Sequence, residues 1–107
     1  MAVGNHVAVS GTAPIMPDDA DPAPDAFGQA KRCLEVVLDA LREVGAGPEH
    51  VVRTRSFLVN ADDWEQVGRA HGEVFADIRP ASTMVVVAAL LDPRWRVEIE
   101  ADAILDP

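Results

Sequence analysis

The chain of 107 residues contains no tyrosine, one cysteine and no long hydrophobic segment. The single cysteine, Cys33, excludes an intrachain disulfide, and no cysteine and histidine residues have the spacing of a zinc site. The longest apolar run, Met84 to Leu91, is too short to span a bilayer, and no targeting signal precedes it. We therefore expect a cytoplasmic protein without a metal or other cofactor and without membrane association.

Basic residues are also scarce, since nine stand against eighteen acidic ones and the net charge is −9. A charge of this sign repels phosphate backbones and anionic lipids. Arg53, Arg55 and Arg96 are too few to form an obvious basic patch. We therefore expect no nucleic-acid partner.

About half of the residues are apolar, which is enough for one two-layered core, so we expect a single domain over residues 1–107. Four prolines and four aspartates fall within residues 13–25. Prolines cannot donate a backbone hydrogen bond, so this segment is predicted to be an exposed loop.

Two segments have the apolar spacing of amphipathic helices. The first begins at Ala26, with Asp25 as its cap and Gly45 and Pro48 at its end, and carries its apolar stripe on Phe27, Ala30, Leu34, Val37, Leu41 and Val44. In the second, Asp62 and Glu65 have the spacing of a capping box, and the stripe is Trp64, Val67, His71, Val74 and Phe75. Pro80 marks the limit of the second helix.

Four segments are predicted to be strands: Asn5 to Ser10, Val51 to Val59, Met84 to Leu91 and Trp95 to Ile104. The first is expected to end in a turn at Ser10-Gly11-Thr12, and Asp92-Pro93-Arg94 is expected to join the last two as a hairpin. The last strand alternates, with apolar side chains on one face and acidic ones on the other.

The order of these elements predicts an α+β protein with one mixed sheet and both helices on the same face, because crossover connections are right-handed. The other face would leave apolar side chains in water at a cost of about 25 cal/mol per Å². Oligomerisation would cover this face and bring Arg53, Arg55 and the acidic side chains close to a subunit boundary.

Several motifs in order resemble the Rid (YjgF) family over nearly the whole chain from Gly4. They are Ser10-Gly11, a helix that starts near Gln29 and ends at Gly45, VVRTRSFLVNADDW, Pro80-Ala81 and VEIEADA. The resemblance implies a chorismate-mutase-like fold, a homotrimer and clefts for small molecules between subunits. For its deaminating members it implies hydrolysis of enamines and imines to ketones and ammonia.

Two departures from the family pattern bear on function. The resemblance implies an arginine after Pro80-Ala81 that binds a substrate carboxylate, but this chain has Ser82, whose hydroxyl offers one neutral hydrogen bond. Deamination of amino-acid-derived imines is therefore in doubt. Relatives also carry a strand with a tyrosine before Gly4-Asn5, so this chain either starts later or differs there.

The resemblance also implies a catalytic glutamate, which is Glu98 in VEIEADA and could orient or deprotonate a water molecule. Without the resemblance, Glu98 is a solvated or ion-paired carboxylate on a strand. His71 is a second candidate acid or base, although its apolar neighbours also fit a buried, hydrogen-bonded histidine. Cys33 is interpreted as a small packing residue.

The candidate substrate-binding residues are Ser10, Gly11, Thr12, Arg55, Ser82 and Thr83. Backbone amides of the Ser10-Gly11-Thr12 turn could bind an anionic group, and the hydroxyls of Ser82 and Thr83 would line the same cleft. Arg55 could replace the lost arginine, but an ion pair with an acidic strand residue is the simpler interpretation.

The leading hypothesis is a trimeric hydrolase that acts on a small reactive metabolite, with Glu98 controlling the water. A non-catalytic trimer that binds a metabolite or a partner protein is the alternative. An endoribonuclease is a poorer third hypothesis because of the negative charge.

Overall fold

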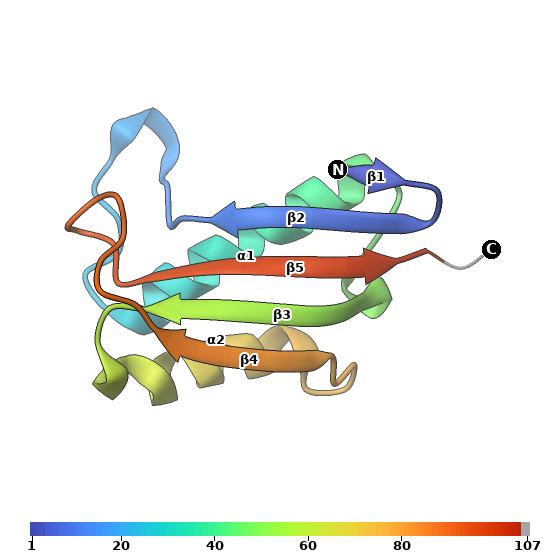
Figure 1. The fold of residues 1–107 in the computed structure, drawn as a ribbon. Coiled ribbons are helices and arrows are strands. Elements are labelled where there is room, and N and C mark those ends of the chain that lie inside the picture. The colour runs from blue at the N-terminus through green and yellow to red at the C-terminus, as the bar shows by residue number, and fades with distance from the viewer. Residues whose placement is uncertain (106–107) are drawn as a thin grey trace.

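The computed structural model describes residues 1–105 and contains one mixed sheet with two helices on one of its faces (Figure 1). The strands are β1 (Ala2–Val3), β2 (His6–Thr12), β3 (Val51–Leu58), β4 (Ala81–Val86) and β5 (Val97–Ile104). The helices are α1 (Ala26–Glu43) and α2 (Trp64–Phe75), with short 3₁₀ turns at Pro17–Asp19, Pro48–His50 and Ala61–Asp63. The predicted α+β architecture is confirmed.

The strand order is β1-β2-β5-β3-β4, so the last strand of the chain lies in the middle of the sheet. Only β3 and β4 are parallel; the other neighbours are antiparallel. The predicted hairpin at Asp92-Pro93-Arg94 is therefore wrong, because β3 separates β4 from β5 and residues 87–96 cross its end. β4 also starts and ends earlier than predicted, and Leu91 is 96% exposed in the connection.

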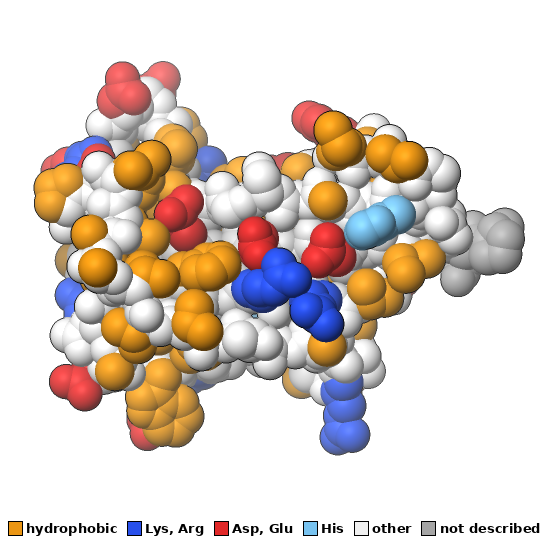
Figure 2. Space-filling model, in the orientation of Figure 1, with side chains coloured by type: hydrophobic (Ala, Val, Ile, Leu, Met, Phe, Trp, Pro, Cys, Tyr) orange, Lys and Arg blue, Asp and Glu red, His pale blue; other side chains and the backbone are white. Residues whose placement is uncertain are grey.

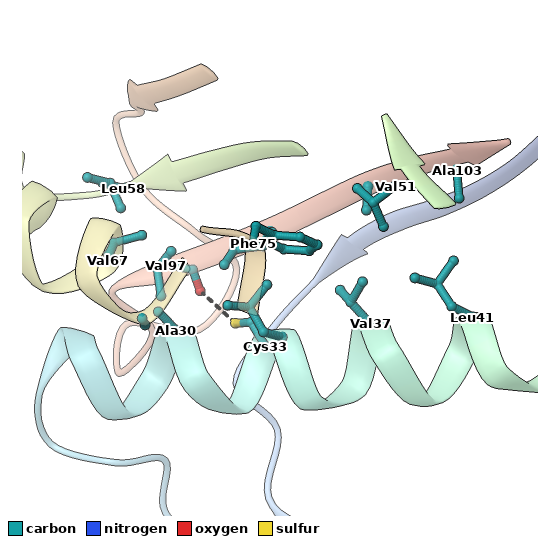
Figure 3. Packing of buried hydrophobic residues seen from close by; sticks show 14 of the residues in the cluster. Ala30, Cys33, Val37, Leu41, Val51, Leu58, Val67, Phe75, Val97 and Ala103 are labelled. Atoms are coloured by element: carbon teal, nitrogen blue, oxygen red, sulfur yellow. Dashed lines mark hydrogen bonds between the residues drawn. The ribbon is translucent and has the colours of Figure 1, made fainter. Parts of the chain in front are cut away.

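The core lies between the helices and the sheet (Figure 3). Ala30, Cys33, Val37 and Leu41 of α1 point at the sheet, where every second residue of β5 is buried: Val97, Ile99, Ala101 and Ala103. The thiol of Cys33 lies 3.7 Å from the carbonyl oxygen of Val97, and burial raises its pKa to about 12. A neutral, buried thiol is a packing group, as predicted.

The boundaries of α1 follow the predicted signals. The carboxylate of Asp25 accepts a hydrogen bond from the amide of Gly28 at 3.0 Å, and Gly45 has a φ of +80° just beyond the helix. Val44 lies after the last helical residue and is exposed, so the apolar stripe ends one turn earlier, at Leu41.

The predicted capping box of the second helix is wrong. The side chain of Asn60 accepts from the amide of Asp62 at 2.9 Å and starts the 3₁₀ turn before α2. Asp63 is buried and forms a two-bond ion pair with Arg96, at 2.8 and 3.0 Å. Trp64 is 59% exposed because the helix begins with this residue on its outer side.

Two further details differ from the expected strands. A register shift between Val51 and Arg53 makes Val51 buried and Val52 exposed, so strict alternation starts only after this bulge. A two-residue strand, β1, pairs with β2 across Gly4, whose φ is +60°. Within residues 1–105 no helix is long and apolar enough to cross a membrane.

The side chain of Gln29 connects α1 to two loops. It is buried, and its amide nitrogen donates to the carbonyl oxygens of Ala23 and Arg94 at 2.9 and 3.0 Å. Its amide oxygen accepts from the backbone nitrogen of Arg96 at 2.7 Å. One side chain therefore fixes the end of the proline-rich loop and the entry into β5.

Replacing this amide should destabilise the protein. Gln29→Leu removes the partners of three backbone groups, and we expect a loss of about 2–4 kcal/mol in the free energy of unfolding, measured by chemical denaturation. Gln66→Leu is the matched control, since that side chain accepts one hydrogen bond, from Phe27. Equal losses in the two variants would contradict the role given to Gln29.

Candidate functional site

The face of the sheet away from the helices carries charged side chains along its middle, with apolar side chains on both sides (Figure 2). These charges include the three carboxylates of β5, namely Glu98, Glu100 and Asp102. Arg55 of β3 donates to Glu100, and this hydrogen bond keeps the pKa of the guanidinium above its ordinary value. His6 lies 3.4 Å from Asp102. The simpler interpretation of Arg55, an ion pair across strands, describes what the structure contains.

Glu98 differs from the other two carboxylates of β5. Its side chain is half-buried, and within residues 1–105 no group forms a hydrogen bond with its carboxylate. Phe57 is its partner on β3, and a Cβ atom added at Gly11 would lie 3.6 Å from its Oε1. The Glu98 carboxylate therefore lies close to Gly11 of β2, on a residue paired with Phe57 of β3, and its oxygens are available for a ligand.

The residues Ser10, Gly11 and Thr12 belong to β2, so the predicted turn is wrong. Val9 pairs with Ala101 and Thr12 with Ile99, which means that three steps along β2 match two along β5. This is a β-bulge. The hydroxyl of Thr12 donates to the carbonyl oxygen of Ser10 at 2.9 Å. The bulge takes the place of the expected amide-lined turn and brings Gly11 next to Glu98.

Ser82 and Thr83 point to opposite sides of β4. Ser82 pairs with Thr54 of β3, and the hydroxyl of Thr54 donates to its Oγ at 3.0 Å on the helix side of the sheet. Thr83 pairs with Arg55 and follows it to the open side. Within one copy of the chain, the two hydroxyls therefore lie on different faces of the sheet.

His71 of α2 lies at the end of a chain of hydrogen bonds that runs through the hydroxyls of Thr54 and Ser82. Its Nε2 lies 2.8 Å from Oγ1 of Thr54, and its ring packs at 4.7 Å from that of Phe75. Burial lowers the pKa of His71 below its ordinary value, so the ring is neutral at pH 7. Thr54 is completely buried, and it was not predicted from the sequence as a site residue. The pattern that could have pointed to it is a threonine on the inward face of β3, which it shares with Ser56 and Leu58.

The two predicted catalytic residues lie apart. His71 is on the helix side of the sheet, whereas Glu98 is on the open side. A depression of about 390 Å³ on the edge of the sheet is lined by Ser10, Arg55 and Glu100 among others, but not by Glu98. In residues 1–105 no group of three histidine, cysteine, aspartate or glutamate side chains could hold a metal ion. Within one copy of the chain, the candidate residues therefore do not form a single site.

Comparison with known proteins shows which family this fold resembles. Residues 1–105 match the model of the family described as endoribonuclease L-PSP. An uncharacterized protein of Streptomyces coelicolor is 37% identical over 103 residues, which are 96% of this chain and 77% of that protein.

Solved structures agree with this match. A Mycobacterium tuberculosis member of the YjgF/YER057c/UK114 family has a TM-score of 0.88 and 36% identity, over 97% of this chain and 82% of that one. Escherichia coli TdcF, solved with bound serine, has a TM-score of 0.91 at 24% identity, over 99% and 85% of the two chains. The chain therefore belongs to the endoribonuclease L-PSP family, the Rid (YjgF) family that its sequence motifs predicted.

Proposed function

We propose that this protein is a hydrolase for a small reactive metabolite, and that Glu98 controls the attacking water in a cleft between subunits. The observation that carries the proposal is that the Glu98 carboxylate has no hydrogen-bond partner among the described residues. Two of the three β5 carboxylates have a charged or titratable partner, but Glu98 has no hydrogen-bond partner within residues 1–105. A carboxylate held by its strand, with free oxygens, can accept a proton from a water molecule.

A cleft between copies accounts for the arrangement of the other candidates. Glu98 faces the open side of the sheet and Ser82 the helix side, so they meet only if different copies contribute them. The open side also exposes apolar groups, including Val85 at 40%, which a second copy would cover. We therefore propose a homotrimer, in keeping with what the family resemblance implies.

The proposed chemistry requires no oxidant or cofactor. Glu98 accepts a proton as the water oxygen bonds to the electrophilic carbon of an imine, and passes this proton to the imine nitrogen to give a carbinolamine. Glu98 then transfers the hydroxyl proton of the carbinolamine to its nitrogen as the carbon–nitrogen bond breaks, and the products are a ketone and ammonia. A carbamate would react at its carbonyl carbon in the same way, with an amine or an alcohol as the leaving group.

The substrate should be small and without a strongly bound carboxylate. Serine bound to the related TdcF supports a small polar ligand. In this chain Ser82 stands where the family resemblance implies an arginine, and Arg55 is already paired with Glu100, so neither residue offers a free guanidinium for a two-bond carboxylate contact. Neutral imines, enamines or carbamates are therefore favoured over amino-acid-derived imines.

Two other functions have some support. A non-catalytic trimer that binds a metabolite would show tight binding in calorimetry without turnover. The family description names an endoribonuclease, but the net charge of −9 on each copy opposes binding to RNA. Salt-dependent RNA binding at physiological ionic strength would favour this activity over the hydrolase.

Replacing Glu98 by glutamine should remove the proton acceptor while keeping the shape of the side chain. We expect at least one member of a panel of imines, enamines and carbamates to be hydrolysed, and kcat to fall about 100-fold or more in Glu98→Gln. Ammonia release measures the reaction. Asp102→Asn is the matched control on the same face of β5, and an equal fall in both variants would argue against a specific role for Glu98.

Light scattering should show a mass three times that of the 11.5 kDa chain. Val85→Lys puts a charge on the apolar part of the open sheet face, which we expect to shift the protein to monomers. Ile15→Lys introduces the same charge at an exposed apolar residue in the proline-rich loop and should leave the trimer intact. A trimer that survives Val85→Lys would contradict this assignment of the interface.

A further inference from the structure

Two hydrogen bonds connect the side chains of His71, Thr54 and Ser82, and the Thr54 hydroxyl is the donor in the bond to Ser82. A threonine hydroxyl carries one proton, and Thr54 gives it to Oγ of Ser82 at 3.0 Å. The contact of 2.8 Å between Thr54 and Nε2 of His71 therefore needs a proton from the ring. Because the ring is neutral at pH 7, this selects the tautomer with its proton on Nε2.

The direction of the chain determines what Ser82 offers to a ligand. Its oxygen already accepts from Thr54, so its own proton points away from that bond, and the side chain is exposed on the edge strand β4. Ser82 is therefore a hydrogen-bond donor toward the outside. Without Thr54 the hydroxyl would rotate freely between donating and accepting.

We propose that Thr54 and His71 are positioning residues that commit the Ser82 hydroxyl to donate to a neutral carbonyl oxygen of the substrate. One uncharged donor matches one carbonyl oxygen, whereas a carboxylate needs charged or paired donors. The inference rests on the proposed function for the place of Ser82 in the cleft, and it names the substrate class as small carbonyl compounds such as carbamates. It also changes the role of His71 from an acid or base to a group that acts through Thr54.

Thr54 is well suited to this role because it cannot exchange its partners. It is completely buried between β4 and α2, so water does not compete for its hydroxyl. His71 is packed against Phe75, which limits the orientations of its ring. Of the two ring nitrogens, Nδ1 forms no hydrogen bond within residues 1–105, so Nε2 makes the only protein contact of this kind that the structure describes.

Binding of methyl carbamate tests the proposal without reference to turnover. The dissociation constant would be measured by NMR from the Ser82 amide, in the Glu98→Gln background so that hydrolysis does not interfere. We expect Thr54→Val to weaken binding about fivefold, the value of one hydrogen bond of about 1 kcal/mol. Thr54→Ser keeps the hydroxyl and should restore binding to within about twofold of the parent.

A second measurement does not depend on any variant. Nitrogen chemical shifts of His71 in the unsubstituted protein at pH 8 should show the tautomer with the proton on Nε2. The tautomer with its proton on Nδ1, equal binding in Thr54→Val and its parent, or no binding of methyl carbamate would each overturn the inference. The dissociation constant and the His71 tautomer are measured directly, so they test the inference even if no substrate is hydrolysed.

Discussion

The fold depends on the alternation of side chains along β5. This strand lies at the centre of the sheet, hydrogen-bonded to β2 and β3, and its apolar residues complete the core under both helices. The residues between them are the carboxylates of the open face. A shift of one residue in its pairing would bury three carboxylates and expose the core residues. Core and candidate site are therefore fixed by the same register.

The sequence predicted the parts of the fold that local patterns determine. The stripe of α1, its Asp25 cap and the alternation of β5 were all found, because each is a property of consecutive residues. The hairpin and the turn at Ser10 were wrong because partners in the sheet are decided by long-range packing. A proline-containing turn between two apolar segments fits a hairpin, but it fits equally well a connection that passes the end of β3.

The candidate site shows the same division. Glu98 could be placed on the polar face of its strand from alternation alone. For Ser82 the following run of apolar residues has no alternation, so the side to which it points depends on the register with β3. That register pairs Ser82 with Thr54, and the helix behind them supplies His71. No spacing in the sequence connects these three residues, which come from three different elements.

Ser82 stands where the family resemblance implies an arginine, and this difference matters more for the proposed ligand than for the fold. Ser82 is exposed on an edge strand, so its side chain contributes little to the core. A substitution there should change the free energy of unfolding only slightly. For the proposed binding role the consequence is larger, because a charged two-bond contact would become a single neutral donor. Such a donor is specific only if its direction is fixed, and a buried hydroxyl held by a histidine is one way to fix it. Under the proposed function, the constraint on the ligand thus passes from charge to the direction of one hydrogen bond.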